Sequence, residues 1–395
     1  MKRVGILLVV GLLIMPRFIG FAQERGEVDA LPFSEIILAQ SEDEIVRLKD
    51  WQEDAEFLFT GDMMFHMPQI EGAKNDLDDG YDFSRSFSAI ESLVSGVDLA
   101  VANLETTLAG ERLPYRGYPQ FNTPDQAAVA IQSAGFDVLM TTEGVCVPSV
   151  KRGLLRTLSV LDELGVQHTG TKVEEEEAVL IVEVEGILVA MINATYGLNG
   201  LESYLTAEER VSLISIIGDG SRIEAEIEAV KESVDFVIVL PHWGQEYQRQ
   251  PSRLQKNLAD RWFDAGADAI IGSHPHVIQP MEVRKNGQFI AYSLGNAISN
   301  QRERVGKPAY WRFTEDGVLL FMTLSKNPWT GETSIIDLRA QPTHVERKWT
   351  GEEWSHRIVP ASPEDMDTKQ SWERTKEQVP GSQDSQKLSE IVMNV

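Results

Sequence analysis

Short apolar runs alternate with amphipathic stretches through the middle of the chain. An unbroken apolar run bounded by turn residues indicates a buried strand, and apolar positions three or four residues apart indicate a helix. The expected strands are residues 56–60, 98–102, 136–140, 235–240 and 268–271. The expected helices are residues 84–95, 124–134, 153–164, 223–232 and 252–265. Strands that alternate with helices in this way predict an α/β fold with buried, parallel strand pairing.

A second group of strands is expected without helices between them. Residues 180–185 and 187–194 are separated by Gly186, which predicts a hairpin. Four later runs read as mostly antiparallel strands, and we expect them to build a second sheet. These runs are residues 277–283, 288–293, 318–324 and 334–339.

The N-terminus has the pattern of a targeting sequence. Lys2 and Arg3 precede an apolar run over residues 4–15, and residues 20–22 read Gly-Phe-Ala. This pattern predicts a signal peptide over residues 1–22 and an exported protein of the periplasm or cell envelope. The apolar run is shorter than the roughly 20 residues of a membrane span. The alternative is an uncleaved anchor, which would be the chain's one attachment to a membrane.

Polarity also separates the remaining regions. Residues 23–54 are polar and acidic, and we expect a linker there. The alternating pattern occupies residues 55–345, which we expect to be the folded domain. Residues 346–395 are polar, and we expect a disordered tail.

Charge and cysteine content exclude several functions. The chain of 395 residues has 36 Lys and Arg against 61 Asp and Glu, a formal net charge of −25. Such acidity argues against a nucleic-acid partner, because phosphate attraction needs a basic face. Cys146 is the only cysteine, so the chain has no intrachain disulfide and no thiolate metal cluster. A bound metal would have to use His, Asp, Glu or Asn.

Polar side chains gather where the expected strands end. Sites in open α/β sheets form beyond the carboxyl ends of the strands. Each such residue alone has an ordinary explanation, as a turn cap or a hydrogen-bonded core imidazole. Their coincidence at one edge predicts a metal centre. The residues are Asp62, Asn103, Glu105, His242, His274 and His276.

Imidazole and carboxylate ligands favour Mn, Zn or Fe, whereas Mg or Ca would prefer oxygen alone. One or two such ions could acidify a bound water into a nucleophile. The sequence contains no GxxxxGK[ST] phosphate loop, GxSxG elbow or HExxH motif that would indicate another chemistry.

Nine runs along the chain match the motifs of a known family in order and spacing. These runs are FTGDMMFHMPQI (59–70), DLAVANLETTL (98–108), YRGYPQFNTPDQ (115–126), AGFDVL (134–139), GLLRTL (153–158), NATYGLNG (193–200), HWGQEYQRQPSRLQKNLAD (242–260), GADAIIGSHPHVIQPME (266–282) and YSLGN (292–296). They resemble the bacterial CapA-like proteins of poly-γ-glutamate capsule synthesis, a branch of the calcineurin-like metallophosphoesterases. The resemblance implies a four-layer αββα sandwich of two mixed β-sheets with a two-metal site between them.

The resemblance also implies roles for single residues. Glu105 takes the place of the bridging carboxylate, and His66 is an additional candidate ligand. Asn103, Glu143 and Asn296 are implied to contact substrate or to support the ligands. The implied metal ligands besides Glu105 and His66 are Asp62, His242, His274 and His276.

One family motif is missing. After GFDV the family pattern has an Asn-Asn-His block, whereas this chain reads Glu143, Gly144 and Val145. The flanking sequence keeps its spacing, so no gap explains the loss. By resemblance, the lost His helps to protonate or steady the leaving group, which valine cannot do. Loss of a general acid typically costs 10²–10⁴-fold in rate. The catalytic residue is therefore unassigned, and Glu143 offers a replacement anionic ligand.

Three functions compete at this stage. The first is a metal- and polymer-binding relative with weakened or absent hydrolysis, working with a capsule or envelope polymer machinery. The second is an active di-metal phosphoesterase-like hydrolase that uses a substitute for the lost His, with an anionic polymer or phosphoester as substrate. The third is a structural envelope protein with vestigial ligands, against which the retained strand-end residues argue.

Overall fold

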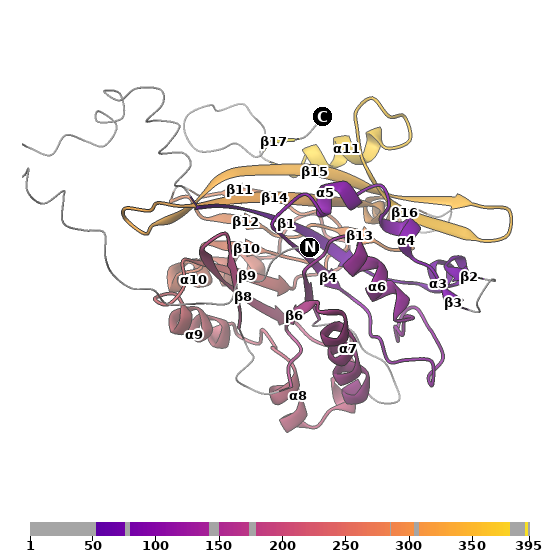
Figure 1. Cartoon of the computed structure of the whole chain (residues 1–395), viewed down its shortest axis with the longest axis horizontal. Coiled ribbons are helices and arrows are strands. Elements are labelled where there is room, and N and C mark those ends of the chain that lie inside the picture. Colours follow the sequence, from indigo (N-terminus) through magenta and orange to yellow (C-terminus); the bar gives the residue numbers. More distant parts are fainter. Residues whose placement is uncertain are drawn as a thin grey trace, which may run out of the picture. The chain divides into compact units, whose positions relative to one another are not determined.

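Two mixed β-sheets form the centre of the fold (Figure 1). The computed structural model describes residues 53–75, 80–141, 150–173, 179–284, 286–303, 308–379 and 392–393. The predicted signal peptide, nearly all of the predicted linker, and Glu143 to Val145 lie outside the described residues. Residues from Gln52 onward belong to one structural unit.

The first sheet is built around β1, which is parallel to β4 on one side and antiparallel to β14 on the other. The short strand β13 (Asn296–Ile298) also pairs with β1, and β17 (Val392–Met393) pairs with β15. The sheet follows the order β16 (Trp354–Pro360), β15 (Thr333–Trp349), β14 (Asp316–Lys326), β1 (Glu53–Met63), β4 (Leu99–Leu104), β5 (Val138–Met140) and β6 (Gln167–Thr169).

The second sheet has a parallel centre, in which β8, β9, β10 and β12 run side by side. Its two edges are antiparallel, and the edge pair β7 and β8 is the hairpin predicted around Gly186. The sheet follows the order β11 (Met281–Val283), β12 (Phe289–Ala291), β10 (Ala269–Ile271), β9 (Phe236–His242), β8 (Ile187–Thr195) and β7 (Leu180–Val184). A separate ribbon pairs β2 (Lys74–Asn75) with β3 (Gly80–Tyr81).

The alternation of side chains along the strands explains the layering. Successive residues of a strand point to opposite faces of its sheet. Phe57 and Phe59 of β1 belong to the same buried cluster as Ile238 of β9, so these faces meet between the sheets. Leu58 packs into a second cluster with helices outside the first sheet, and Val239 packs into a third outside the second sheet. The described residues therefore stack as helix, sheet, sheet and helix layers, which agrees with the predicted α/β sandwich of two mixed sheets.

Helices cover both outer faces. The first sheet is covered by α4 (Ser84–Phe87), α5 (Glu91–Val94), α6 (Gln126–Ser133) and α7 (Val150–Leu164). The second is covered by α9 (Ser221–Val230) and α10 (Arg253–Ala265). The remaining helical segments are α3 (Met67–Gly72), α8 (Ala207–Leu213), α11 (Lys369–Lys376), and the 3-10 helices η2 (Glu202–Tyr204) and η3 (Ala309–Glu315). Within the described part of the chain, every helix is too short or too polar to cross a bilayer.

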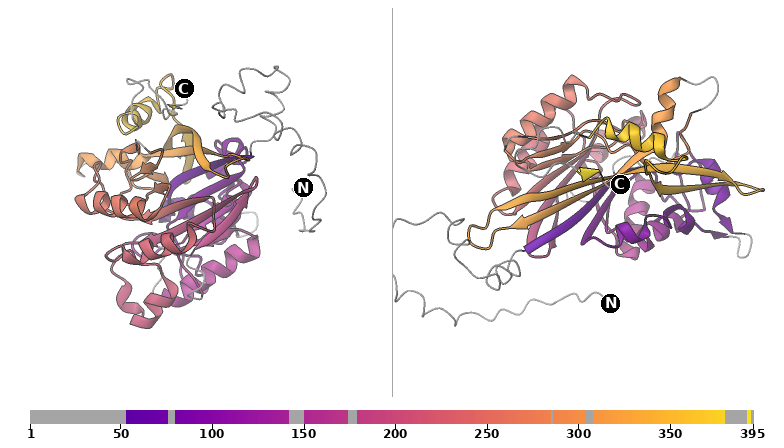
Figure 2. Two further views of the ribbon diagram at one scale, coloured as in Figure 1. Left: turned by 90° about the vertical axis from the view of Figure 1, so that its left-hand side faces the viewer. Right: turned by 90° about the horizontal axis from the view of Figure 1, so that it is seen from above.

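The prediction of a disordered tail from residue 346 is wrong for the described residues. The strand β15 runs on to Trp349, and β16 and α11 follow it. Figure 2 shows the yellow α11 lying over the long strands β14 and β15. Arg374 of α11 donates two hydrogen bonds of 2.5 Å to the buried carboxylate of Asp316, and Trp372 is buried beside it. A bidentate charged pair anchors this helix, although its overall composition is polar.

The later strands also divide between the sheets, which corrects the expectation that they build the second sheet together. The strands β11 and β12 extend the second sheet beside β10. By contrast, β14 and β15 extend the first sheet beside β1. Each of these strands has enough apolar side chains to be buried in either sheet. The hydrophobic pattern alone therefore could not predict which sheet each strand joins.

A half-buried histidine, His344, and a buried one, His356, in the first sheet predict an acid-labile fold. Burial, followed by the charges of Arg302 and Arg374, lowers the pKa of His344 to about 4. Burial, followed by the charges of Arg347 and Arg302, lowers the pKa of His356 to about 3. Both stay neutral in the folded chain, whereas the unfolded chain takes up protons below its ordinary histidine pKa of about 6.5. Stability is therefore complete above pH 6.5 and is lost as the pH falls toward 3.

We expect each histidine to lower the free energy of unfolding by about 2 kcal/mol when the pH is lowered from 7.5 to 5. Urea unfolding at the two pH values measures this loss. The double variant His344→Gln, His356→Gln should lose markedly less between the same pH values, whatever its absolute stability. An equal pH dependence in both proteins would show that other groups control acid unfolding.

Candidate metal centre

A close approach of two backbone segments fixes Asp62 at the end of β1. A Cβ atom on Gly61 would lie 1.9 Å from the carbonyl oxygen of Gly295, so only glycine fits there. The backbone N–H of Asp62 donates to the same oxygen at 2.9 Å. The register between β1 and β4 shifts between Thr60 and Asp62, and the Asp62 side chain is completely buried.

The end of β4 supplies the next two polar residues. Asn103 lies opposite Asp62 in the parallel register, and its Nδ2 donates to Asp62 Oδ1 at 2.8 Å. Its Nδ2 is also 3.2 Å from His242 Nδ1. Glu105 follows, buried, with its backbone N–H donating to the carbonyl of Met63 at 3.1 Å. Parallel pairing of β1 with β4 thus brings both carboxylates to one edge.

The second sheet contributes the imidazoles. His242 ends β9, and its Nδ1 is 2.9 Å from the hydroxyl of Ser273. His274 follows Ser273, and its Nδ1 is 3.1 Å from His242 Nε2. His276 Nδ1 lies 3.0 Å from Asp62 Oδ2. The predicted histidines of two separate strand ends therefore meet the predicted aspartate across the two sheets.

The loop that holds His274 and His276 is conformationally strained. Both residues have positive φ, 95° for His274 and 57° for His276. Non-glycine residues occupy this region at a cost of order 1–3 kcal/mol each, and such outliers cluster at functional sites. The backbone N–H of His274 also points at Asp62 Oδ2, at 3.2 Å. The strained loop thus presents the His276 imidazole and the His274 backbone N–H to the Asp62 carboxylate.

Three of the predicted ligands form a tight group. One side-chain donor atom from each of Asp62, Glu105 and His276 lies within 4.8 Å of the other two, and all three residues are buried. Donor atoms at this separation can converge on a single ion. His242 and His274 adjoin the group on the side of the second sheet.

Electrostatics favour an ionised Asp62 and a neutral His274. Burial raises the pKa of Asp62, but the hydrogen bond and charge of His276 and the charge of His242 outweigh it, and the net pKa lies below its ordinary value. Burial, followed by repulsion from His242 and His276, holds the pKa of His274 well below the ordinary range. An ionised carboxylate beside a neutral imidazole is the form that coordinates a cation.

An amide oxygen provides a direct test of whether these residues suit a metal. Asn103 is fully buried, and its Oδ1 has no hydrogen-bond partner among the residues that the structure describes. A buried acceptor of this kind is costly unless a cation or a water satisfies it. The set of imidazole nitrogens and carboxylate and amide oxygens fits a divalent transition metal.

Other predicted site residues lie outside the tight group. His66 Nδ1 accepts from the backbone N–H of Asn300 at 3.3 Å, and its ring packs edge-on against Phe121. Its role as a ligand stays a prediction. Asn296 pairs with Asp62 through the backbone, while its side-chain amide donates to the carbonyl of Thr314 at 2.9 Å. Its role in supporting the ligands or contacting substrate stays a prediction.

Sequence reasoning missed three residues that contact the histidines. Ser273 hydrogen-bonds His242, and the ring of Tyr196 lies 4.2 Å from that of His274. Glu246 Oε1 lies 4.0 Å from His276 Nε2. The motifs HWGQEY and NATYG contain Glu246 and Tyr196. Tyr196 directly follows β8, but its phenol was not among the His, Asp, Glu and Asn side chains expected to hold a metal, and Glu246 lies four residues beyond the end of β9.

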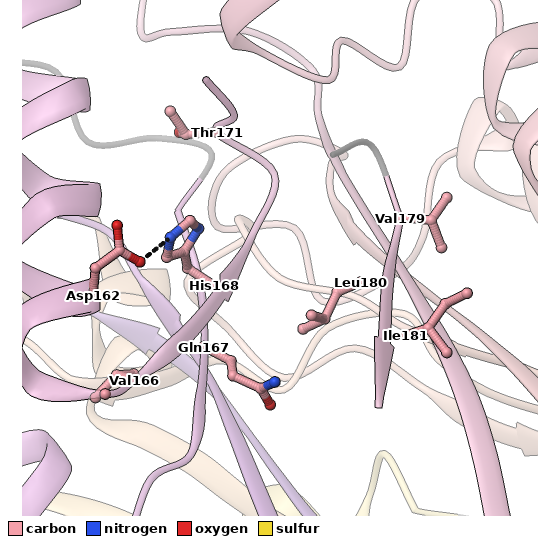
Figure 3. Close-up of a pocket in the computed structure, with 9 residues that line it drawn as sticks. Asp162, Val166, Gln167, His168, Thr171, Val179, Leu180 and Ile181 are labelled. Carbon is pink, nitrogen blue, oxygen red and sulfur yellow. Dashed lines mark hydrogen bonds and ion pairs between the residues drawn. The ribbon is translucent and has the colours of Figure 1, made fainter. Parts of the chain in front are cut away.

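A separate cavity of about 530 Å³ opens at the edge strands β6 and β7 (Figure 3). Its polar feature is a 3.1 Å contact between His168 Nε2 and Asp162 Oδ1, with apolar side chains including Leu180 and Ile181 around it. Among the residues that the structure describes, none of the predicted site residues lines this cavity. The described lining offers one imidazole and one carboxylate, which is fewer than the strand-end group has.

Comparison with known proteins agrees with the motifs. The family model for the bacterial capsule synthesis protein PGA_cap matches residues 56–301. A capsule biosynthesis protein CapA of Bacillus anthracis is 29% identical over 218 residues, which cover 54% of this chain and 49% of that protein. A PGA biosynthesis protein CapA of Bacillus subtilis (strain 168) is 28% identical over 269 residues, covering 66% of this chain and 67% of that protein. The chain thus spans about half the length of the first relative and two thirds of the second.

Two solved structures align with the chain. A novel phosphatase from Mycoplasma pneumoniae covers 74% of this chain and 94% of its own, with a TM-score of 0.41 and 13% identity. The calcineurin-like phosphoesterase YfkN of Bacillus subtilis covers 82% of this chain and 97% of its own, with a TM-score of 0.38 and 13% identity. Similarity at this level carries no assignment of activity.

Proposed function

The chain belongs to the bacterial capsule synthesis family PGA_cap, and from that premise we propose that it is an exported, CapA-like protein of capsule or envelope polymer synthesis. Its buried strand-end group binds one or two divalent transition-metal ions, Mn, Zn or Fe, and its hydrolase activity is weakened or absent. The observation that carries the proposal is the convergence of Asp62, Glu105 and His276 from three separate strand ends.

The chain's own residues explain how the ions would be held. Asp62 accepts from His276 Nδ1 and from Asn103 Nδ2, which orients both side chains. Ser273 in the same way holds His242. Partners of this kind fix the tautomer and direction of the ligands in metal proteins. A bound ion would supply Lewis acidity and a more acidic water at this place.

Weak turnover is proposed because the chain lacks the proton donor of the family pattern. Val145 stands where the family has histidine, and an isopropyl group can neither give nor take a proton. Glu143 adds a negative charge nearby in sequence, which would oppose an anionic polymer or phosphoester unless metal neutralises it. Binding without rapid hydrolysis fits this combination, within the capsule or envelope polymer machinery.

A second candidate is an active di-metal hydrolase that uses a substitute proton donor. The observation in its favour is that side-chain donor atoms of Asp62, Glu105 and His276 lie within 4.8 Å of one another, with His242 Nδ1 4.0 Å from Asp62 Oδ1. The two candidates differ in turnover rather than in metal content.

Metal analysis of purified native protein, together with an assay on a generic phosphodiester, tests the proposal. We expect at least one Mn, Zn or Fe ion per chain and turnover far below that of a working phosphodiesterase. Metal with brisk turnover would favour the active hydrolase. A chain that takes up no divalent metal, even after incubation with Mn²⁺ or Zn²⁺, would refute both.

Export is a separate part of the proposal. The basic start, the short apolar run and the Gly-Phe-Ala pattern at residues 20–22 support it. Mass spectrometry of the native mature chain should give an N-terminus near Gln23. An intact Met1 on chains recovered from the cytoplasm would contradict it.

A further inference from the structure

Five rings form a continuous row through the metal centre, and we call them the ring row. Tyr310 stacks on Tyr247 with ring centroids 5.3 Å apart, and the Tyr247 ring lies 6.0 Å from that of His276. The His276 ring lies 5.8 Å from that of His274, which in turn lies 4.2 Å from the ring of Tyr196. The ring row begins on η3, just before β14 of the first sheet, and ends directly after β8 of the second.

The two ends of the ring row are exposed, whereas its imidazoles are buried. The exposed fractions are 39% for Tyr310 and 42% for Tyr196, against 3% for each of His274 and His276. A single exposed tyrosine is common and needs no explanation. Two exposed tyrosines at opposite ends of one row, with two proposed metal ligands between them, put aromatic surface on both sides of the metal centre.

Contacts within the fold hold both ends of the ring row in place. The hydroxyl of Tyr196 donates to Asn199 Oδ1 at 3.2 Å. Tyr310 stacks on Tyr247, and the backbone N–H of Tyr247 donates to the carbonyl of Pro275 at 2.8 Å. Because these rings are already positioned, a ligand that stacks on them costs little conformational entropy, which favours binding.

The charge distribution of aromatic rings indicates the class of ligand. The face of such a ring is negative and its edge is positive. The C–H groups on the flat face of a sugar ring carry partial positive charge, so they stack favourably on tyrosine. A poly-γ-glutamate chain has no ring and carries a carboxylate on every residue, which the aromatic face repels.

A carboxylate beside the ring row favours the same class. The side chain of Glu246 is 40% exposed, and its Oε1 lies 4.0 Å from His276 Nε2. An ionised carboxylate accepts hydrogen bonds from sugar hydroxyls and repels the carboxylates of a polyglutamate. The exposed surface next to the imidazoles thus suits a neutral, hydroxyl-rich ring.

We propose that Tyr196 and Tyr310 are stacking sites for sugar rings, so that the polymer at this centre is a glycan rather than a polyglutamate. The inference rests on the proposed function in capsule or envelope polymer synthesis and names the substrate class of that site. A glycan chain stacked on both ends of the ring row crosses the metal centre between them.

Calorimetric titration of the purified native protein tests the proposal. The probes are hexasaccharides of glucose and of N-acetylglucosamine, with a γ-linked hexamer of glutamate as the anionic chain. We expect the protein to bind at least one saccharide, and to bind it more tightly than the glutamate hexamer. Tyr196→Ala and Tyr310→Ala should each raise the saccharide Kd about two- to tenfold, the effect of losing one aromatic contact. The double variant should raise it further.

Two kinds of control show whether the rings themselves are responsible. Tyr196→Phe and Tyr310→Phe keep the ring, so the Kd should stay within about twofold of the wild-type value. The matched control is Tyr204→Ala, which removes a tyrosine of 54% exposure from η2, outside the ring row, and should leave the Kd unchanged. Equal melting temperatures and equal Mn²⁺ content in all variants would exclude misfolding and metal loss as causes of weaker binding.

The possible outcomes separate this inference from the function on which it rests. Wild-type protein that holds metal but binds neither saccharide would overturn the stacking assignment and leave the metal centre standing. Tighter binding of the glutamate hexamer would also overturn the assignment, as would saccharide binding that the alanine variants leave unchanged or that Tyr204→Ala weakens equally. Saccharide binding that depends on both tyrosines, in a chain that takes up no divalent metal, would overturn the proposed metal centre alone.

Discussion

Replacing His274 and His276 together by alanine should lower the affinity for divalent metal by at least about 100-fold. The change at His276 removes the imidazole of the tight group. The change at His274 removes the imidazole that contacts His242. It also leaves Asp62 buried without the hydrogen bond and charge that lower its pKa. Each lost ligand or orienting partner typically costs 10–100-fold in metal affinity. Metal content per chain and the Kd for Mn²⁺ are the quantities to measure.

The control for this variant is His168→Ala. His168 pairs with Asp162 at the separate cavity, so its loss removes one imidazole from the chain and none from the metal centre. A second double variant with glutamine at 274 and 276 keeps more side-chain volume and separates ligand loss from a packing defect. Full retention of metal in both double variants would refute the assignment of these histidines.

Much of this site could be predicted from the sequence because functional residues of open α/β sheets gather beyond the carboxyl ends of the strands. Asp62 and His276 are 214 positions apart, yet Asp62 lies at the end of β1 and His276 lies five residues after β10, and the structure brings their side chains to 3.0 Å. The rule works because strands of an α/β fold present their carboxyl ends at one edge. It requires only the position of each strand end, which apolar runs mark clearly.

Other contacts were invisible because they depend on tertiary packing. Glu246 reaches His276 only because the Tyr247 backbone is tied to Pro275 in another loop. Nothing in the spacing of the HWGQEY motif indicates that contact. The choice of the first sheet for β14 depends on its antiparallel pairing with β1, a long-range match between two apolar strands. A hydrophobic pattern indicates that a strand is buried, but it does not specify which strand pairs with it.

In the C-terminal region the sequence analysis missed ordered elements instead of missing contacts. Composition predicted disorder after residue 345, because most residues there are polar. The strand β16 nevertheless buries His356 and Ile358 through alternation, and α11 is held by one bidentate pair between Arg374 and Asp316. A short amphipathic element needs few buried positions, so an average over fifty residues conceals it.

Restoring the family pattern at residues 143–145 should raise phosphodiesterase turnover at least about tenfold, the lower end of a general acid's contribution. The variant is the triple change Glu143→Asn, Gly144→Asn, Val145→His. The motive is sequence alone, because valine replaces the proton donor and Glu143 adds a charge that opposes an anionic substrate. The rate on a generic phosphodiester with saturating Mn²⁺ measures the gain.

The gain must depend on the metal centre if the explanation is correct. Adding the His274→Ala and His276→Ala changes to the restored variant should abolish the new activity. Without these ligands the site would hold no ion to activate a water, so a proton donor at residue 145 would have no nucleophile to work with. The pH profile gives an independent signature. A restored imidazole should introduce a dependence on a group that titrates in the histidine range, which the unaltered chain lacks at that position. If the unaltered protein already turns over the substrate briskly and the triple variant gains nothing, the proton donor lies elsewhere, and the lost motif does not limit this chain.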